Sequence, residues 1–158
     1  MKHAKWLVAA LAAGFASGVA FASEPSQAER DTKKLAAALV AKDYLAVADL
    51  THPAVVKQAG GADKVVKLLQ DANAGLTINR MKFGKPQHTA EVGGTLIATF
   101  PYRSNVTYKG KTVDLDSFYI GFSVDKKGWK FVDCEGVTQA YLGQLLPGYK
   151  NNLELKGC

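Results

Sequence analysis

The chain contains few residues of the kinds that build metal centres. Its 158 residues include two cysteines and three histidines, and only His52 and His88 follow the first 22 residues. Neither an H-x-H nor an H-x-x-x-H spacing occurs, although such closely spaced ligands are typical of zinc sites. The sequence therefore predicts no metal site and no bound cofactor.

Clustered positive charge is also scarce, although the formal net charge is +6. Basic residues are adjacent only at Lys33-Lys34 and Lys126-Lys127, and the others are dispersed along the chain. Dispersed charges are typical of a solvated surface, whereas nucleic-acid binding proteins concentrate them on one face. We expect no nucleic-acid partner.

Only one stretch of the chain is apolar over a long distance, residues 6–22. Lys2 and Lys5 precede it, and Ala20-Phe21-Ala22 places small residues at the two positions that a signal peptidase reads. The sequence predicts a signal peptide at residues 1–22, cleaved after Ala22, and a periplasmic or secreted protein. The alternative is an uncleaved N-terminal anchor, because a run of about 17 residues is near the lower limit for spanning a bilayer.

The remaining residues, 23–158, show no internal repeat, low-complexity tract or linker. They are enough for one domain with a sizeable core. No later stretch is long enough to cross a bilayer, so cleavage would leave no stable membrane anchor. We predict a single domain over residues 23–158.

The two cysteines, Cys134 and Cys158, could pair in an oxidising compartment. In the chain-entropy model, closing this loop stabilises the fold by about 3.5 kcal/mol. A reactive thiol is the alternative, but the flanking Asp133 and Glu135 disfavour a thiolate at position 134. An intermolecular bridge would also satisfy the pattern. We predict a structural disulfide.

Helical patterns occupy the first half of residues 23–158 and strand patterns the second. Ser26-x-x-Glu29 is a capping box at the start of the first helix. Further helices are expected at residues 44–50, 54–58 and 62–74, and a short one at 138–146. Strands are expected at residues 76–83, 88–92, 96–108, 112–124 and 129–134. Helices followed by hairpin-linked strands predict an α+β fold with the helices on one face of an antiparallel sheet.

Several short motifs resemble the cystatin-like, nuclear transport factor two-like (SnoaL-like) superfamily, in particular its small secreted bacterial members. They are Lys42-Asp43-Tyr44, Thr51-His52-Pro53, Gly60-Gly61 and the "KKGWKFVD" segment at residues 126–133. The resemblance covers residues 26–149. It implies a cystatin-like roll, in which N-terminal helices pack in the concave face of a strongly bent, cone-like sheet. The family includes enzymes, ligand carriers and interaction domains, and this chain has no copy of the isomerase tyrosine-aspartate arrangement.

The strand at residues 112–124 changes its apolar face halfway. Val113 and Leu115 occupy odd positions, whereas Phe118 and Ile120 occupy even ones. A bulge at Asp116-Ser117 would bend the strand and bring all four side chains to the inner face. The alternative is an unbulged strand that places Asp114 and Asp116 beside Phe118 at the mouth of the hollow, where paired carboxylates could act as general acid and base.

We expect an exported, non-enzymatic binding module with a small apolar or amphipathic ligand in an aromatic-lined hollow. The expected ligand contacts are Tyr44, His52, Phe100, Tyr102, Phe118, Trp129 and Phe131. A protein partner or a homodimer on the outer sheet face is an equal possibility, with a surface made of Ile97, Thr99, Tyr119, Gly121, Lys130 and Val132. The alternative function is an isomerase or dehydratase that uses His52, Asp114 or Asp116 with tyrosine hydroxyls. His52 could instead be a helix cap.

Overall fold

The computed structural model describes residues 26–124, 126–135 and 137–150, so the predicted signal peptide at 1–22 and Cys158 lie outside the described residues. The helices are α1 (Gln27–Ala41), α2 (Tyr44–Leu50), α3 (Pro53–Gln58), α4 (Ala62–Ala72) and α5 (Gln139–Leu145). The strands are β1 (Leu76–Phe83), β2 (Gln87–Val92), β3 (Thr95–Tyr108), β4 (Lys111–Val124) and β5 (Lys130–Asp133). This order confirms the α+β class. Within the described residues, no helix combines the length and apolarity that a membrane crossing requires.

Polar side chains begin the helices at the positions that the sequence indicates. Ser26 and Glu29 form the predicted capping box of α1, in which each side chain binds the other residue's backbone N–H. Asp43 caps α2, His52 caps α3 and Thr138 caps α5, each by accepting a backbone N–H. These caps satisfy N–H groups that a helix leaves without partners at its start.

All strand pairings are antiparallel, and β3 is the centre of the sheet. The strand order is β1-β3-β4-β5, and β2 also pairs with β3. β1 lies along the second half of β3 and β2 along its first half. Pro101 lies where β1 gives way to β2, and its carbonyl accepts from the backbone N–H of Gly84 at 2.8 Å. At this gap between two partner strands, the missing N–H of proline interrupts no ladder.

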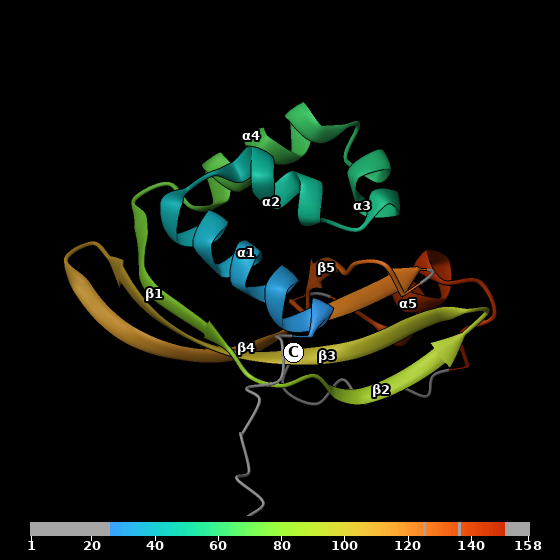
Figure 1. Cartoon of the computed structure of the whole chain (residues 1–158). Coiled ribbons are helices and arrows are strands. Elements are labelled where there is room, and N and C mark those ends of the chain that lie inside the picture. Colours follow the sequence, from blue (N-terminus) through green and yellow to red (C-terminus); the bar gives the residue numbers. More distant parts are fainter. Residues whose placement is uncertain (1–25, 125, 136, 151–158) are drawn as a thin grey trace, which may run out of the picture.

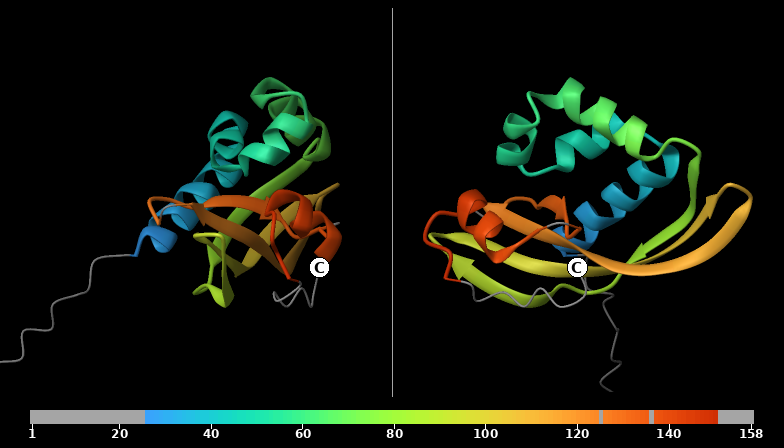
Figure 2. Two further views of the ribbon diagram at one scale, coloured as in Figure 1. Left: turned by 90° about the vertical axis from the view of Figure 1, so that its right-hand side faces the viewer. Right: turned by 180° about the vertical axis from the view of Figure 1, so that it is seen from behind.

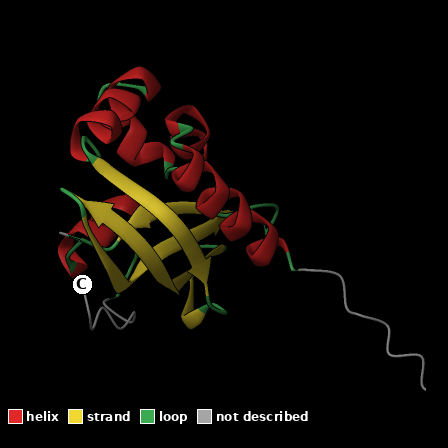
Figure 3. Ribbon diagram, turned by 90° about the vertical axis from the view of Figure 1, so that its left-hand side faces the viewer, coloured by secondary structure: helices red, strands yellow, loops and turns green. Residues whose placement is uncertain are grey.

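The sheet curves around the N-terminal helices, as the family resemblance implies. Figure 1 shows β3 and β4 as one long curved hairpin, with α1 across its concave side and α2, α3 and α4 above. The views from the side and from behind show the same arrangement (Figure 2). Figure 3 shows the first four helices on one side of the strands. The predicted arrangement of helices in a bent antiparallel sheet is confirmed.

The predicted bulge at Asp116-Ser117 is wrong. The pairing of β4 with β3 continues without a shift from Thr95↔Val124 to Tyr108↔Lys111. Register shifts occur instead in the strands on the other side of β3, between Ile78 and Arg80 in β1 and between Gln87 and Ala90 in β2. Bulges do accompany the bend, because an extra residue increases local twist, but they lie in β1 and β2.

The unbroken register assigns the residues of β4 to the two faces of the sheet. Leu115 and Tyr119 share the concave face with Phe100, which packs under α1. Ile120 and Phe122 share the outer face with Ile97, and that part of the outer face is covered by α5 through Leu142 and Leu145. The change of apolar face in the sequence therefore records where α5 begins to cover the outer face.

A buried carboxylate joins the first helix to the last strand. Asp31 in α1 is only 4% exposed, and its Oδ2 accepts from the backbone N–H of Trp129 and from Nε2 of Gln27, each at 2.9 Å. Lys34 Nζ lies 3.5 Å from the other oxygen. Such complete satisfaction is what makes a buried charge tolerable. This contact fixes the position of α1 relative to the start of β5.

Candidate functional site

An open, largely apolar cavity of about 740 Å³ lies between the helices and the concave face of the sheet. All four N-terminal helices and four of the strands contribute to its walls. The apolar lining includes Leu35, Leu39, Val47, Leu50, Val65, Leu68, Leu69, Ile78, Met81, Val106, Leu115 and Phe131. Pockets of this size and composition are typical of small-molecule sites.

Two tyrosines line the cavity and are held by an aromatic cluster. The ring centroids of Tyr102 in β3 and Tyr119 in β4 are 5.5 Å apart. Phe83, at the end of β1, lies 5.7 Å from Tyr102 and 5.8 Å from Tyr119. Tilted and edge-on contacts of this kind are favourable and restrict the rings. The two side chains therefore present their hydroxyl groups from a fixed aromatic base.

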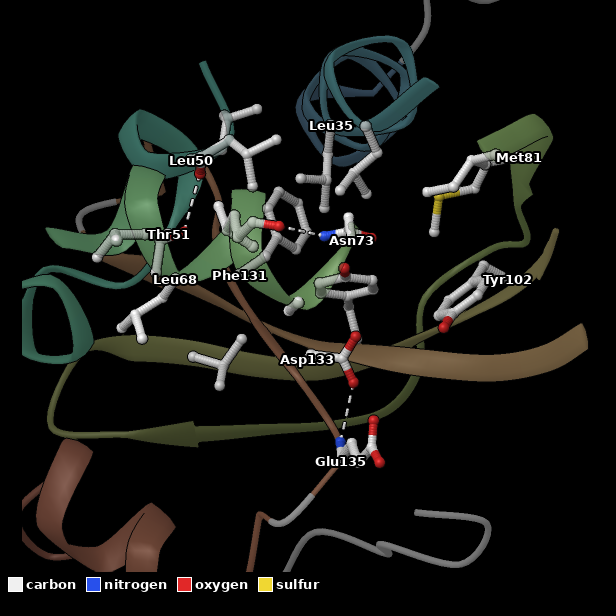
Figure 4. Close-up of a pocket in the computed structure, with 18 of the residues that line it drawn as sticks. Leu35, Leu50, Thr51, Leu68, Asn73, Met81, Tyr102, Phe131, Asp133 and Glu135 are labelled. Atoms are coloured by element: carbon white, nitrogen blue, oxygen red, sulfur yellow. Dashed lines mark hydrogen bonds between the residues drawn. The ribbon is translucent and has the colours of Figure 1, made fainter. Parts of the chain in front are cut away.

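Two carboxylates lie at the same end of the cavity as these tyrosines. Asp133 is the last residue of β5 and pairs directly with Tyr119 of β4. Its Oδ1 accepts from the backbone N–H of Glu135 at 2.9 Å, which fixes the turn that follows β5. Figure 4 shows Tyr102, Asp133 and Glu135 at one end, away from Leu35 and Leu50. Both carboxylate residues are exposed, so this end is the wet mouth of an apolar hollow.

The electrostatic environment keeps both phenols protonated. Burial raises the pKa of Tyr119, and the negative charge of Asp133 and a hydrogen bond to its side chain raise it further. Burial also raises the pKa of Tyr102, and Asp133 adds to the shift. Both effects disfavour a phenolate, because a second negative charge would form in a partly dry site. At neutral pH both hydroxyls therefore keep their protons, and the hydroxyl of Tyr119 donates to the side chain of Asp133.

His52 lies at the start of α3, outside the cavity lining. Its Nδ1 accepts from the backbone N–H of Ala54 at 3.3 Å, and its ring packs edge-on against Phe122 with centroids 4.6 Å apart. The backbone N–H of His52 donates to the backbone carbonyl of Phe131 at 3.0 Å, which joins the α2–α3 connection to the edge of β5. Burial lowers its pKa. These contacts make His52 the N-cap of α3, which is the alternative role that the sequence analysis allowed.

The predicted pair of carboxylates does not face the hollow. Asp114 and Asp116 lie on the outer face of β4, exposed to solvent. Arg103 on β3 lies between them, 4.0 Å from Asp114 and 3.7 Å from Asp116, and Asn105 donates to Asp114 at 2.7 Å. The alternative prediction, a strand without a bulge, correctly placed Asp114 and Asp116 on the same face as Phe118. It was wrong in placing that face at the mouth of the hollow.

Of the seven side chains expected to contact a ligand, the structure brings Tyr102 and Phe131 into the cavity lining. Phe100 and Trp129 pack edge-on under α1, with ring centroids 5.0 Å apart, and belong to the inner core. Phe118 belongs to the outer core beneath α5. Tyr44, the first residue of α2, lies outside the lining. Aromatic side chains at strand spacing were therefore mostly core.

The outer surface that was expected to support a partner or homodimer is not a single face. Tyr119 and Gly121 lie on the concave side, whereas Ile97 and Thr99 lie on the outer side and are buried. The expectation was wrong about this surface because it placed a bulge in β4, which exchanges the two faces of one strand. The outer face is covered by α5 at one end and carries the polar Arg103 network at the other.

Cys134 follows Asp133 but faces the opposite side. Its thiol is 1% exposed within the outer core, and its sulfur lies 3.6 Å from Oγ of Ser117. It forms no disulfide within the described part of the chain, and because Cys158 lies outside that part, the pairing stays a prediction. Among the described residues, no group of three or more His, Cys, Asp or Glu side chains could hold a metal ion.

Sequence reasoning missed Asp133, Glu135 and the inward orientation of Tyr119. The signal for Asp133 was present, because it shares the odd positions of Trp129 and Phe131, which were expected on one face. Tyr119 and Leu115 both occupy odd positions, so a strand without a bulge places them on the same face. This was the signal for the inward orientation of Tyr119. The burial of Asp31 could not be predicted from the sequence, because a single Asp in a helix is usually exposed to solvent.

Comparison with known proteins finds likeness among solved structures and in neither of the other comparisons. No family model matches the chain, and no match was found among curated proteins. Among solved structures, the chain is similar to an NTF2-like protein of unknown function from Burkholderia pseudomallei K96243, with 15% identity and a TM-score of 0.38. The match covers 78% of this chain and 99% of the other. The fold assignment rests on the topology of the chain itself.

Proposed function

We propose that this protein is a binding protein that holds a small, largely apolar or amphipathic ligand between its helices and its curved sheet. The observation that supports this most is the cavity of about 740 Å³, with largely apolar walls and the carboxylates of Asp133 and Glu135 at one end. An apolar ligand gains free energy by leaving water for such walls, and a few polar groups fix its orientation. Tyr102 and Phe131, both expected as contacts, belong to the lining.

Native mass spectrometry of the protein, purified without detergent from its producing cell, tests the proposal. The expected result is a retained small mass that denaturation releases. Binding of the neutral apolar dye N-phenyl-1-naphthylamine provides a second readout. Replacing Ser104, which is buried and lines the cavity, by Phe fills part of the space and should weaken dye binding at least about tenfold.

The matched control is Arg103→Phe, one residue earlier in β3, because the side chain at position 103 is exposed on the outer face. This variant adds a phenylalanine to the same strand without entering the cavity and should bind the dye as the unaltered protein does. Equal binding by Ser104→Phe and Arg103→Phe would place the dye elsewhere. A protein that retains no mass and binds no dye would contradict the proposal.

A catalytic role is the second candidate, and the structure changes the residues on which it would depend. His52, Asp114 and Asp116 lie away from the cavity, whereas Asp133 pairs with Tyr119 inside it. A carboxylate beside neutral phenols can move a proton while a phenol stabilises the charge that develops. Incubating the released ligand with the unaltered protein and with Asp133→Asn distinguishes the roles, because only an enzyme would alter the ligand, and only with Asp133 present.

Export is part of the same proposal and rests on the apolar segment at residues 6–22. Intact-mass measurement of the protein from its producing cell should give a chain that begins at Ser23. Peptide mapping without reductant should give a linked pair of peptides containing Cys134 and Cys158. A chain that begins at Met1, or free thiols at both positions, would contradict the corresponding part.

A further inference from the structure

The mouth of the cavity carries a charge opposite to that of the chain as a whole. The formal net charge is +6, yet among the described residues that line the cavity the charged ones are Asp133 and Glu135, and none is Lys, Arg or His. The lining of the separate open groove between α1 and β1 includes four basic residues, Lys33, Arg80, Lys82 and Lys85, and one acidic residue, Glu29. The acidic mouth is therefore a local property of this end of the cavity.

Several carboxylates of the described residues lie beside a cation, but these two do not. Asp114 and Asp116 lie near Arg103, Asp31 near Lys34, and Asp71 near Lys67. Within the described residues, neither Asp133 nor Glu135 takes part in an ion pair. Oxygen atoms of both side chains therefore remain available to a charged group that arrives from solvent.

The neighbouring groups also favour a cation over an anion. Tyr102 and Tyr119 offer aromatic faces and hydroxyl oxygens beside the carboxylates, and both can contact an ammonium group. An anionic head group would meet two like charges and be repelled by them. A neutral head group would gain only ordinary hydrogen bonds.

We propose that the ligand carries a positively charged, amine-like end that lies between Asp133 and Glu135, with its apolar body between α4 and the sheet. This inference rests on the proposed function, because it names the class of ligand for the same cavity. The apolar body contacts Leu68, Leu69 and Leu115, and the amine donates charge-assisted hydrogen bonds at the mouth.

Three probes with the same decyl chain test the head group: decylamine, decanol and decanoate. Each is used at neutral pH, below its micelle concentration, to displace N-phenyl-1-naphthylamine from the protein purified from its producing cell. Decylamine should bind at least about tenfold more tightly than decanol, because hydrogen bonds to charged groups contribute more than neutral ones. Decanoate should bind most weakly. Added salt should reduce the affinity of decylamine relative to that of decanol, because salt screens the attraction between charges.

The double variant Asp133→Asn with Glu135→Gln keeps the shapes of both side chains and removes both charges. It should lower the affinity for decylamine to that for decanol, about tenfold, and leave decanol unchanged. The matched control, Asp114→Asn with Asp116→Asn, removes the same charge from the outer face and should keep the preference for the amine. Circular dichroism melts establish that both variants fold.

The outcomes separate this inference from the proposed function. If no probe displaces the dye and the dye itself does not bind, the proposed function fails. If all three probes displace it with equal affinity, or decanoate binds best, the proposed function stands and the amine inference is overturned. A preference for decylamine that survives in the double variant at residues 133 and 135 would overturn the assignment to these carboxylates.

Discussion

The two halves of the β3–β4 hairpin have the same strand pairing but different surroundings. Near the turn, Val113 and Leu115 are 50% and 47% exposed, and their outward neighbours Asp114 and Asp116 are exposed as well. Further along β4, residues 120–123 are all buried, with α1 over the concave face and α5 over the outer one. One strand is therefore core at one end and cavity wall at the other.

This comparison shows that an apolar pattern reports which faces are covered. Where one face is covered, apolar residues alternate, and where both are covered, they can occupy either parity. A change of phase within a strand therefore indicates that a covering element begins there. In this chain the element is α5, which lies later in the sequence.

The largest expected contrast compares Ile120→Ala with Leu115→Ala in the same strand. Ile120 is fully buried, so its truncation should lower the free energy of unfolding by about 3 to 4 kcal/mol through lost transfer energy and the cavity left behind. Leu115 is 47% exposed and should lose less than about 1 kcal/mol. Urea denaturation measures both. Equal losses would mean that the two halves do not differ in packing.

A somewhat smaller effect is expected from Gly121→Ala, which tests the tightness of the buried half. A Cβ at position 121 would lie 2.3 Å from the ring of Phe100 and 2.9 Å from that of Trp129. The rings must shift, which should cost about 2 to 3 kcal/mol in urea denaturation.

Gly143→Ala is the control for that substitution, because a Cβ at this helical position in α5 meets no atom of the described residues within 4 Å, apart from the neighbouring backbone of its own helix. It should raise stability by about 0.5 to 1 kcal/mol, since alanine favours a helix more than glycine does. If Gly121→Ala leaves the free energy of unfolding unchanged, the rings of Phe100 and Trp129 are not packed tightly against position 121.

The smallest effect concerns pH and His52, whose ring lies against Phe122 in the buried half. Burial lowers its pKa from the ordinary value of about 6.5, so the unfolded chain binds this proton more readily than the folded protein does. The stability that depends on the neutral ring is complete above about pH 6.5 and is lost as the pH falls through the lower, folded pKa.

His52→Asn measures this contribution, because asparagine can still cap α3 but does not titrate. Urea denaturation over a pH series should show a smaller loss of stability below about pH 6.5 in the variant than in the unaltered protein. Parallel curves for the two proteins would mean that His52 has the same pKa in the folded and unfolded states.

Local signals were sufficient to predict the elements of the fold. The capping box at Ser26 and Glu29, the caps at Asp43 and Thr138, and the glycine-containing turn after Tyr108 each depend on chemistry within a few residues. These signals predicted helices followed by an antiparallel sheet, and the family resemblance added the bend. The order of elements could therefore be derived without tertiary information.

The candidate site was predicted poorly because it depends on contacts across strands. Asp133 becomes a cavity residue only through its pairing with Tyr119, and Tyr119 faces inward only because β4 has no bulge. A shift of one residue exchanges the faces, so one wrong assumption at Ser117 moved Tyr119 out of the hollow and Phe118 into it. Residue types alone do not fix that register.

The bond from the Trp129 backbone N–H to the Asp31 carboxylate spans 98 residues. Asp31 is therefore synthesised long before Trp129, whose backbone N–H it binds. Until the β4–β5 hairpin has been synthesised, water solvates the carboxylate of Asp31, and α1 lacks the contact that fixes it against the start of β5. We expect the hollow to acquire its final shape only after nearly the whole domain has been synthesised, whatever the order in which its helices form.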